Sequence, residues 1–160
     1  MRDVYTKAYD VHNTVFYDQT GHFPTISKRG NKYIIVMVDI DSNTILVEPL
    51  KNRTYAELTR AYCVMMLRLK RAGIIPQNYI LDNEVSTAIK TTIHDEYKMK
   101  LELVPPGCHC HNTAEVAIQN FKAHFLSVLA GTSEVFSQSI WKGLLTKAKV
   151  TVNLLRQSNK

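Results

Sequence analysis

The sequence of 160 residues lacks any apolar run near the ~20 residues that a membrane-spanning helix needs. Its first residues, Met-Arg-Asp-Val-Tyr-Thr-Lys, contain no hydrophobic signal core. Internal repeats, low-complexity segments and a dividing linker are also missing. These absences argue against a membrane protein and a secreted protein. They predict one domain over residues 14–160, preceded by an N-terminal flank over residues 1–13.

Cysteine is scarce and oddly spaced. There are three cysteines, Cys63, Cys108 and Cys110, and two of them are one residue apart. An odd number in this arrangement is not typical of a disulfide framework, so we expect a reducing compartment. Cys108-His109-Cys110-His111 alternates without the gaps that structural zinc sites place between their ligands. We therefore interpret this segment as an active-site loop rather than a zinc site.

The charge balance favours a basic protein. Lysine and arginine number 20 against 14 acidic residues, which gives a formal net charge of +6 and a pI near 9.2. Such a balance is a modest sign of nucleic-acid binding, and an ordinary basic protein remains the alternative. The chain is 45% apolar, which is enough for one domain with a hydrophobic core.

The apolar pattern predicts strands alternating with helices. Strands are expected at residues 14–19, 33–38, 45–47, 79–81 and 101–104. Helices are expected from a Thr54–Glu57 capping box, from Ser86, over 112–129, and from Trp141 to Leu155. The order is β-β-β-α-β-α-β-α-α. It predicts an α/β fold with a five-stranded mixed sheet and helices on both faces.

Helical spacing also predicts which residues are buried. Arg60, Arg68 and Arg71 lie off the apolar stripe of the first helix, and we interpret them as a solvated face. The last two helices are expected to bury Ala114, Ile118, Phe121, Phe125 and Val128, and then Trp141, Leu144, Leu145, Ala148, Val152 and Leu155.

Three acidic residues are the candidates for chemistry. Asp18 and Asp82 each follow a short apolar run, and Glu115 lies in the first turn of an expected helix. Functional groups gather at the carboxyl ends of adjacent strands, and three converging carboxylates suit Mg²⁺ or Mn²⁺. Paired ions of this kind drive in-line attack on phosphodiesters. Spacing alone leaves a structural role open, because Asp-Asn and Asp-Gln pairs are common in turns.

One face of the expected helix after Asn112 is polar. Glu115, Gln119 and Lys122 fall at i, i+4 and i+7 and therefore share that face, opposite the apolar stripe. A cation two turns from a metal-binding carboxylate could hold a DNA phosphate. The alternative for Glu115 is a capping role, because a glutamate near a helix start is common.

Five segments in order carry a resemblance to a known family. They are Tyr-Asp-Gln-Thr-Gly-His-Phe-Pro, Gly-Asn-Lys-Tyr-Ile-Ile-Val-Met-Val-Asp, Leu-Asp-Asn-Glu, Leu-Val-Pro-Pro and Asn-Thr-Ala-Glu-Val-Ala-Ile-Gln-Asn-Phe-Lys. In this order they resemble the catalytic core of retroelement integrases, above all the copia-like LTR retrotransposon type. The resemblance runs from about residue 14 to the end of the chain.

The resemblance implies an RNase H-like fold and DNA integration. It assigns the ligands of a two-metal Mg²⁺ or Mn²⁺ site to Asp18, Asp82 and Glu115, and DNA contacts to Asn83, Gln119 and Lys122. Such enzymes trim retroelement DNA ends and join them to target DNA. DNA and further copies of the chain are the expected partners. After synthesis in the cytoplasm, the expected site of action is the nucleus.

Some features depart from the family pattern. Gln119 stands where retroviral integrases often have lysine, and Val116 and the Cys108–His111 loop replace basic residues. The family's N-terminal zinc module and C-terminal DNA-binding region are not in this sequence. We therefore expect a core excised from a polyprotein or a decayed genomic copy. The alternatives are an inactive remnant that at most binds nucleic acid, and an RNase H-like nuclease without joining activity.

Overall fold

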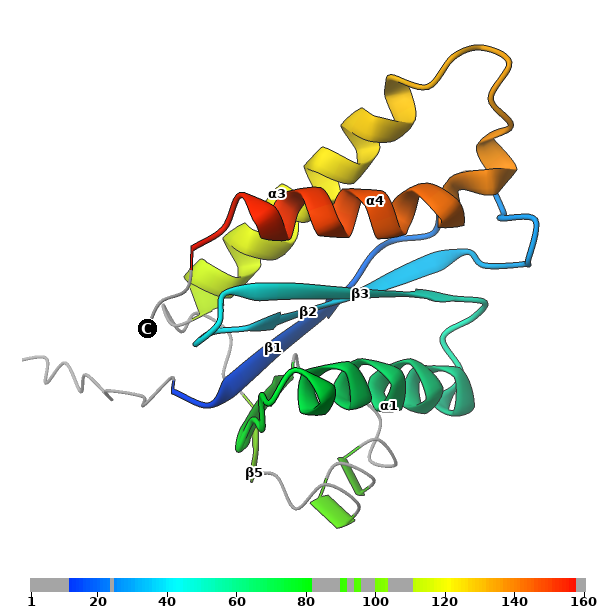
Figure 1. Ribbon diagram of the computed structural model, residues 1–160. Coiled ribbons are helices and arrows are strands. Elements are labelled where there is room, and N and C mark those ends of the chain that lie inside the picture. Colours follow the sequence, from blue (N-terminus) through cyan, green and yellow to red (C-terminus); the bar gives the residue numbers. More distant parts are fainter. Residues whose placement is uncertain are drawn as a thin grey trace, which may run out of the picture.

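The computed structural model describes residues 12–23, 25–81, 90–91, 94–95, 100–103 and 111–157. One sheet organises this part of the chain, with α1 on one face and α3 and α4 on the other (Figure 1). The elements in chain order are β1 (Thr14–Gln19), β2 (Tyr33–Asp39), β3 (Thr44–Leu50), α1 (Tyr55–Arg71), β4 (Asn78–Leu81), β5 (Lys100–Leu103), α3 (His111–Ala130), the 3₁₀ turn η1 (Gln138–Ile140) and α4 (Trp141–Leu154).

The sheet is mixed, with the strand order β3-β2-β1-β4-β5. Strands β1, β2 and β3 form an antiparallel meander, whereas β4 lies parallel to β1 and β5 lies parallel to β4. Phe16 pairs with Val38 on one side and with Ile80 on the other, so β1 is a central strand. A mixed sheet with helices on both faces agrees with the prediction from the sequence.

Strand β2 supplies side chains to two cores because its residues alternate between the faces of the sheet. Ile35 and Met37 pack with Met65 of α1, while Ile34 and Val36 pack under α3 and α4. Burial on both faces explains why β2 is a continuous apolar run. Each large apolar side chain that is fully buried contributes roughly 1.5–3 kcal/mol to folding.

Strand β3 lies at the edge of the sheet, and side chains from both helical layers satisfy its backbone. The outward carbonyls of Asn43, Ile45, Val47 and Pro49 accept hydrogen bonds from Arg156, Asn153, Arg68 and Arg60, respectively. An edge strand with free carbonyls and amides would be a template for pairing with another chain. The helix side chains therefore close this edge.

Two arginines differ from the prediction of a solvated face. Arg60 Nη1 and Arg68 Nη2 each lie 3.0 Å from a carboxylate oxygen of Glu48 on β3. Glu48 projects from a buried strand, and its charge draws both guanidinium groups onto the sheet edge. The sequence pattern placed these residues off the apolar stripe but could not show that a carboxylate faces them.

The predicted capping box at the start of α1 is wrong. Thr54 is the N-cap residue, but its side chain makes no capping hydrogen bond and instead donates to Oδ1 of Asn52. Glu57 accepts hydrogen bonds from the backbone N–H of Lys51 at 3.1 Å and from Arg60. Competing local partners thus take both side chains that the box requires.

The buried faces of α3 and α4 also need two corrections. In α3 the buried residue near the C-terminus is Leu129 rather than Val128. Leu155 is the C-cap residue of α4 and is 80% exposed, because α4 ends at Leu154 before the stripe reaches it. None of the helices in the described ranges has the length and hydropathy needed to cross a bilayer.

Candidate active site

Asp18 lies near the end of β1, where the buried part of the strand stops. The first four residues of the strand are buried, and the side chain of Asp18 is 47% exposed. Tyr17 packs into the core under α1, so its neighbour Asp18 faces the opposite layer, which contains α3. Its Oδ1 accepts a hydrogen bond from the backbone N–H of Gln19 at 2.7 Å. The other oxygen, Oδ2, faces α3.

Lys122 of α3 forms an ion pair with Asp18. Its Nζ contacts Oδ2 of Asp18 and lies 3.5 Å from the backbone oxygen of Gln19. The side chain of Lys122 is 27% exposed, so this pair is partly open to solvent. A cation can therefore reach the carboxylate of Asp18, which is a predicted metal ligand.

Glu115 lies on the same helix as Lys122 but nearer its start. Helix α3 begins at His111, so Glu115 is in the second turn rather than in the predicted first turn. Its Oε1 accepts a hydrogen bond from Nε2 of Gln119 at 3.2 Å, which confirms that these two residues share a face. Glu115 precedes Lys122 by about 10.5 Å along the helix axis. Asp18 thus contacts the helix through Lys122, two turns after Glu115.

The second aspartate of the predicted triad is not among the described residues. Strand β4 ends at Leu81, and both Asp82 and Asn83 lie outside the described residues, as do Cys108, His109 and Cys110. Within the part of the chain that is described, no three His, Cys, Asp or Glu side chains gather as a metal site would require. The described half of the site is therefore Asp18, Lys122 and the Glu115–Gln119 pair.

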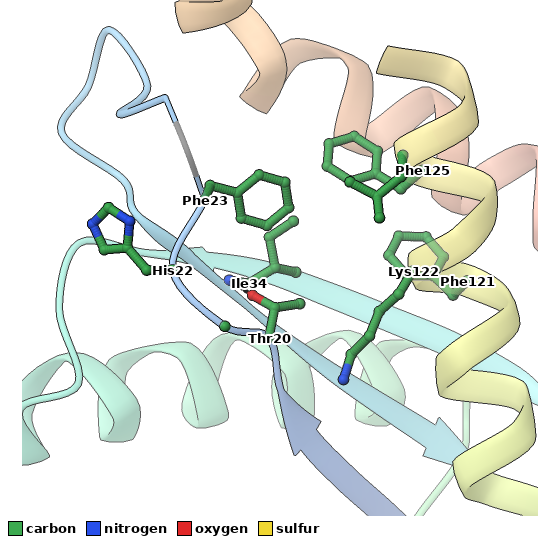
Figure 2. Close-up of a pocket in the computed structure, with 9 residues that line it drawn as sticks. Thr20, His22, Phe23, Ile34, Phe121, Lys122 and Phe125 are labelled. Carbon is green, nitrogen blue, oxygen red and sulfur yellow. Dashed lines mark hydrogen bonds between the residues drawn. The ribbon is translucent and has the colours of Figure 1, made fainter. Parts of the chain in front are cut away.

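An apolar cavity of about 230 Å³ adjoins Lys122 (Figure 2). Phe121 and Phe125 of α3 form one wall, and Thr20, Phe23 and Ile34 come from the sheet side. Figure 2 shows the aliphatic stem of Lys122 beside this cavity, with its nitrogen directed toward the end of β1. The sequence pattern did not predict this cavity. The only sequence feature that could have indicated it is the i, i+4 pair of phenylalanines next to a lysine.

Aromatic contacts and hydrogen bonds hold the residues that line the cavity. Phe23 stacks on Trp141 with ring centroids 4.9 Å apart, and Phe125 meets Trp141 edge to face at 6.3 Å. Thr20 exchanges hydrogen bonds with Ile34 through its backbone N–H and its side chain, each at 2.8 Å. These contacts hold the segment after Asp18 against β2. They therefore fix the backbone that follows Asp18 in the candidate site.

The described residues supply only part of the donor set that a hard divalent cation needs. Asp18 offers a half-exposed carboxylate, and the ammonium group of Lys122 is a stand-in cation in contact with it. Carboxylate oxygens are the ligands that Mg²⁺ and Mn²⁺ prefer. Lys122 would have to leave Asp18 to admit such an ion, and its partial exposure leaves room for that movement.

Comparison with known proteins shows the fold. The sequence matches no protein-family model and no curated protein. The structure is similar to the catalytic core domain of BIV integrase, with a TM-score of 0.67 and 14% identity over 91% of this chain and 86% of that one. It is also similar to the HTLV-2 integrase catalytic core domain in complex with magnesium in a dimeric form, with a TM-score of 0.66 and 19% identity over 91% and 88%. The chain therefore has the RNase H-like α/β fold of retroviral integrase catalytic cores.

Proposed function

We propose that this chain is the catalytic core of a metal-dependent polynucleotidyl transferase that trims retroelement DNA ends and joins them to target DNA. The observation that carries the proposal is the place of Asp18. This carboxylate lies at the exposed end of the central strand, in contact with a cation, in a chain with the fold of integrase catalytic cores. The buried carboxylate of Glu48, by contrast, pairs with two arginines.

The strand register supports Asp82 as a second ligand. Strands β1 and β4 are parallel, and Phe16 pairs with Ile80. Asp18 follows Phe16 by two positions, and Asp82 follows Ile80 by two positions in the sequence. Parallel strands bring equivalent positions to the same edge of a sheet, which favours a shared site. We assign Glu115 as the third ligand because it precedes Lys122 on the helix that faces Asp18.

The described residues would have distinct roles. Asp18, Asp82 and Glu115 would hold one or two Mg²⁺ or Mn²⁺ ions, which supply an activated attacking oxygen and a stabilised leaving oxygen when bound. Lys122, once released from Asp18, is positioned to bind a DNA phosphate beside the site. Gln119 holds Glu115 through its side-chain hydrogen bond. Asn83 is assigned only as a neighbour of the second aspartate and a DNA contact.

The source and assembly of the enzyme are part of the proposal. The motif order resembles the copia-like LTR retrotransposon type, and we propose that class of element as the origin. The similar HTLV-2 core is a dimeric form in complex with magnesium, which supports magnesium as the cofactor and an oligomer as the working state here. DNA is the substrate in both steps.

A strand-transfer assay tests the proposed function. The purified protein would be incubated with a labelled DNA end, a target duplex and Mg²⁺ or Mn²⁺, and products would be separated by length. We expect trimmed ends and longer joined products, both lost when the metal is chelated. Asp18→Asn is the matched negative control, since it removes one ligand charge without changing side-chain size. Joined products from Asp18→Asn at the wild-type level would refute the assignment.

The same assay separates the alternatives. Metal-dependent cleavage without any joined product would indicate an RNase H-like nuclease. Folded protein that binds DNA but yields neither product with either metal would indicate an inactive remnant. The departures at Gln119 and Val116 are the features that favour this last outcome, because lost positive charge weakens contact with phosphates.

A further inference from the structure

A basic groove of about 390 Å³ lies where the connection between β1 and β2 meets the start of α4. Lys28 and Arg29 of the connection line one side, and Lys142 and Thr146 of α4 line the other. Figure 1 shows the two segments together at one end of the molecule. The backbone N–H of Lys28 donates to the carbonyl of Ser139 at 2.7 Å, so the two sides of the groove are joined.

The turn that carries Lys28 and Arg29 is well fixed. The N–H of Gly30 donates to the carbonyl of Ser27 at 2.7 Å, and the hydroxyl of Ser27 accepts from the N–H of Asn31 at 2.9 Å. Both Ser27 and Asn31 are buried. Gly30 has a φ of 81°, which a glycine adopts without strain. The two basic residues therefore occupy the tip of a fixed turn.

The charges in this groove are uncompensated. Lys28, Arg29 and Lys142 form no ion pair with any residue in the described ranges, whereas the cations on the sheet edge and at Asp18 are paired. No acidic residue lines the groove among those described. Helix α4 also begins here without a side-chain cap at Ile140, so the positive end of its dipole adds to the potential.

We propose that this groove binds the phosphodiester backbone of duplex DNA, at a place separate from the acidic site. Three cations from two segments line the groove, two of them are exposed at a surface turn, and phosphate groups are the partners that such cations bind on DNA. The inference rests on the proposed function for the choice of DNA over another polyanion. The binding itself requires neither a metal nor the carboxylates.

The groove and the acidic site are connected through α3 and α4. Trp141, the first residue of α4, packs on Phe125 of α3, and Lys122, which contacts Asp18, lies about one turn before Phe125. A DNA end that is processed near Asp18 would then be held by its backbone at the groove.

The test compares charge removal at the groove with equal charge removal elsewhere. The groove variant carries Lys28→Gln, Arg29→Gln and Lys142→Gln. The control variant carries Lys51→Gln, Lys70→Gln and Arg71→Gln, which alter three exposed cations. A fluorescein-labelled duplex of about 20 base pairs would be titrated without metal across a KCl series, with anisotropy as the readout, and circular dichroism would confirm folding.

We expect the groove variant to bind about tenfold more weakly at low salt. The slope of log K against log salt should fall by about 2–3, since each phosphate contact contributes about 0.9. The control variant should change that slope by less than about 1. Equal slopes for the two variants, or an unchanged groove variant, would overturn the proposal. So would equally tight, groove-dependent binding of labelled poly-glutamate, which would indicate an acidic protein partner instead.

Failure of the groove and failure of the proposed function give different results. If Asp18→Asn loses metal-dependent chemistry and the groove variant, but not the control variant, loses DNA binding, both inferences are supported. If the groove and control variants bind alike while wild type still joins DNA, only the groove inference fails. If the groove variant alone loses binding and wild type performs no metal-dependent chemistry, the groove inference stands and the catalytic proposal fails.

Discussion

Two carboxylates in this protein meet cations in opposite ways. Glu48 on β3 has a side chain that is only 11% exposed, and two arginines hold it while also bonding the backbone of the same strand. Asp18 on β1 is 47% exposed and meets one lysine, whose only other polar contact among the described residues is the carbonyl of Gln19 at 3.5 Å. Glu48 is therefore buried and paired with two cations, whereas Asp18 is half-exposed and paired with one.

This difference supports a structural role for Glu48 and agrees with the catalytic role that we propose for Asp18. Removing a partner from Glu48 leaves buried charge and unsatisfied backbone carbonyls, so this cluster stabilises the fold. A half-exposed pair such as Asp18–Lys122 contributes only about 0–1 kcal/mol to stability and can exchange its cation. Mutations at the two sites should therefore separate activity from stability.

The largest effect is expected on activity from Asp18→Asn. Loss of one ligand charge should reduce metal-dependent DNA cleavage by at least about 100-fold, which exceeds the usual effect of changing a residue that only supports a ligand. The free energy of unfolding should change by less than about 1 kcal/mol, because the pair is half-exposed. Rates from gel-resolved products, with urea unfolding of the same preparation, measure both. DNA cleavage by Asp18→Asn within a factor of two of wild type would show that Asp18 has no larger part in the chemistry than Glu48 has.

Glu48→Gln should produce the reverse pattern. We expect a loss of about 2 kcal/mol in the free energy of unfolding, because the glutamine oxygen can accept from one arginine while its amide NH2 group, itself a donor, faces the other. Cleavage per folded molecule should stay at the wild-type level. Urea unfolding followed by circular dichroism gives the stability. An unchanged midpoint would show that the arginines are held by the β3 carbonyls alone.

Lys122→Glu should weaken DNA binding without a large effect on stability. It replaces a phosphate contact with a negative charge, so the slope of log K against log salt should fall by about 1. Lys147→Glu, at an exposed position of α4, is the matched control for the charge change. Anisotropy titrations with a short duplex would measure both variants. Equal behaviour of the two would mean that DNA does not cross this face of α3.

The smallest effect is expected from Glu57→Gln. The hydrogen bond from Arg60 lowers the pKa of Glu57 below 4.5, so the charged form stabilises the folded state. That contribution is present above pH 4.5 and is lost as the pH falls through the folded-state value. Wild type should exceed Glu57→Gln by about 0.5 kcal/mol at neutral pH, with no advantage in strong acid. Unfolding at pH 7 and at about pH 3 tests the sign.

Much of the fold followed from local pattern. The buried strands stand out because β2 is apolar on both faces, and α1 and α3 show clear helical stripes. What the pattern missed depends on contacts between distant residues. Glu48 draws Arg60 and Arg68 onto the edge of β3, and no spacing rule within α1 indicates that partner.

The candidate site was only partly predictable. The places of Asp18 and Lys122 followed from the end of an apolar run and from helical spacing, but their contact with each other did not. The cavity beside Lys122 and the basic groove at Lys28 are formed by segments far apart in the sequence. The assignments of Asp82 and Asn83 remain predictions, because both lie outside the described residues.

Calorimetric titration of Mn²⁺ into the folded protein measures whether Asp18 holds a metal ion. We predict that wild type binds the ion and that Asp18→Asn binds it at least about tenfold more weakly. Lys122→Met should bind it several-fold more tightly, because no ammonium group then competes for Asp18. Glu48→Gln should match wild type. Binding to Asp18→Asn as tight as to wild type would contradict the account, since the open carboxylate on β1 would then have no part in holding the metal.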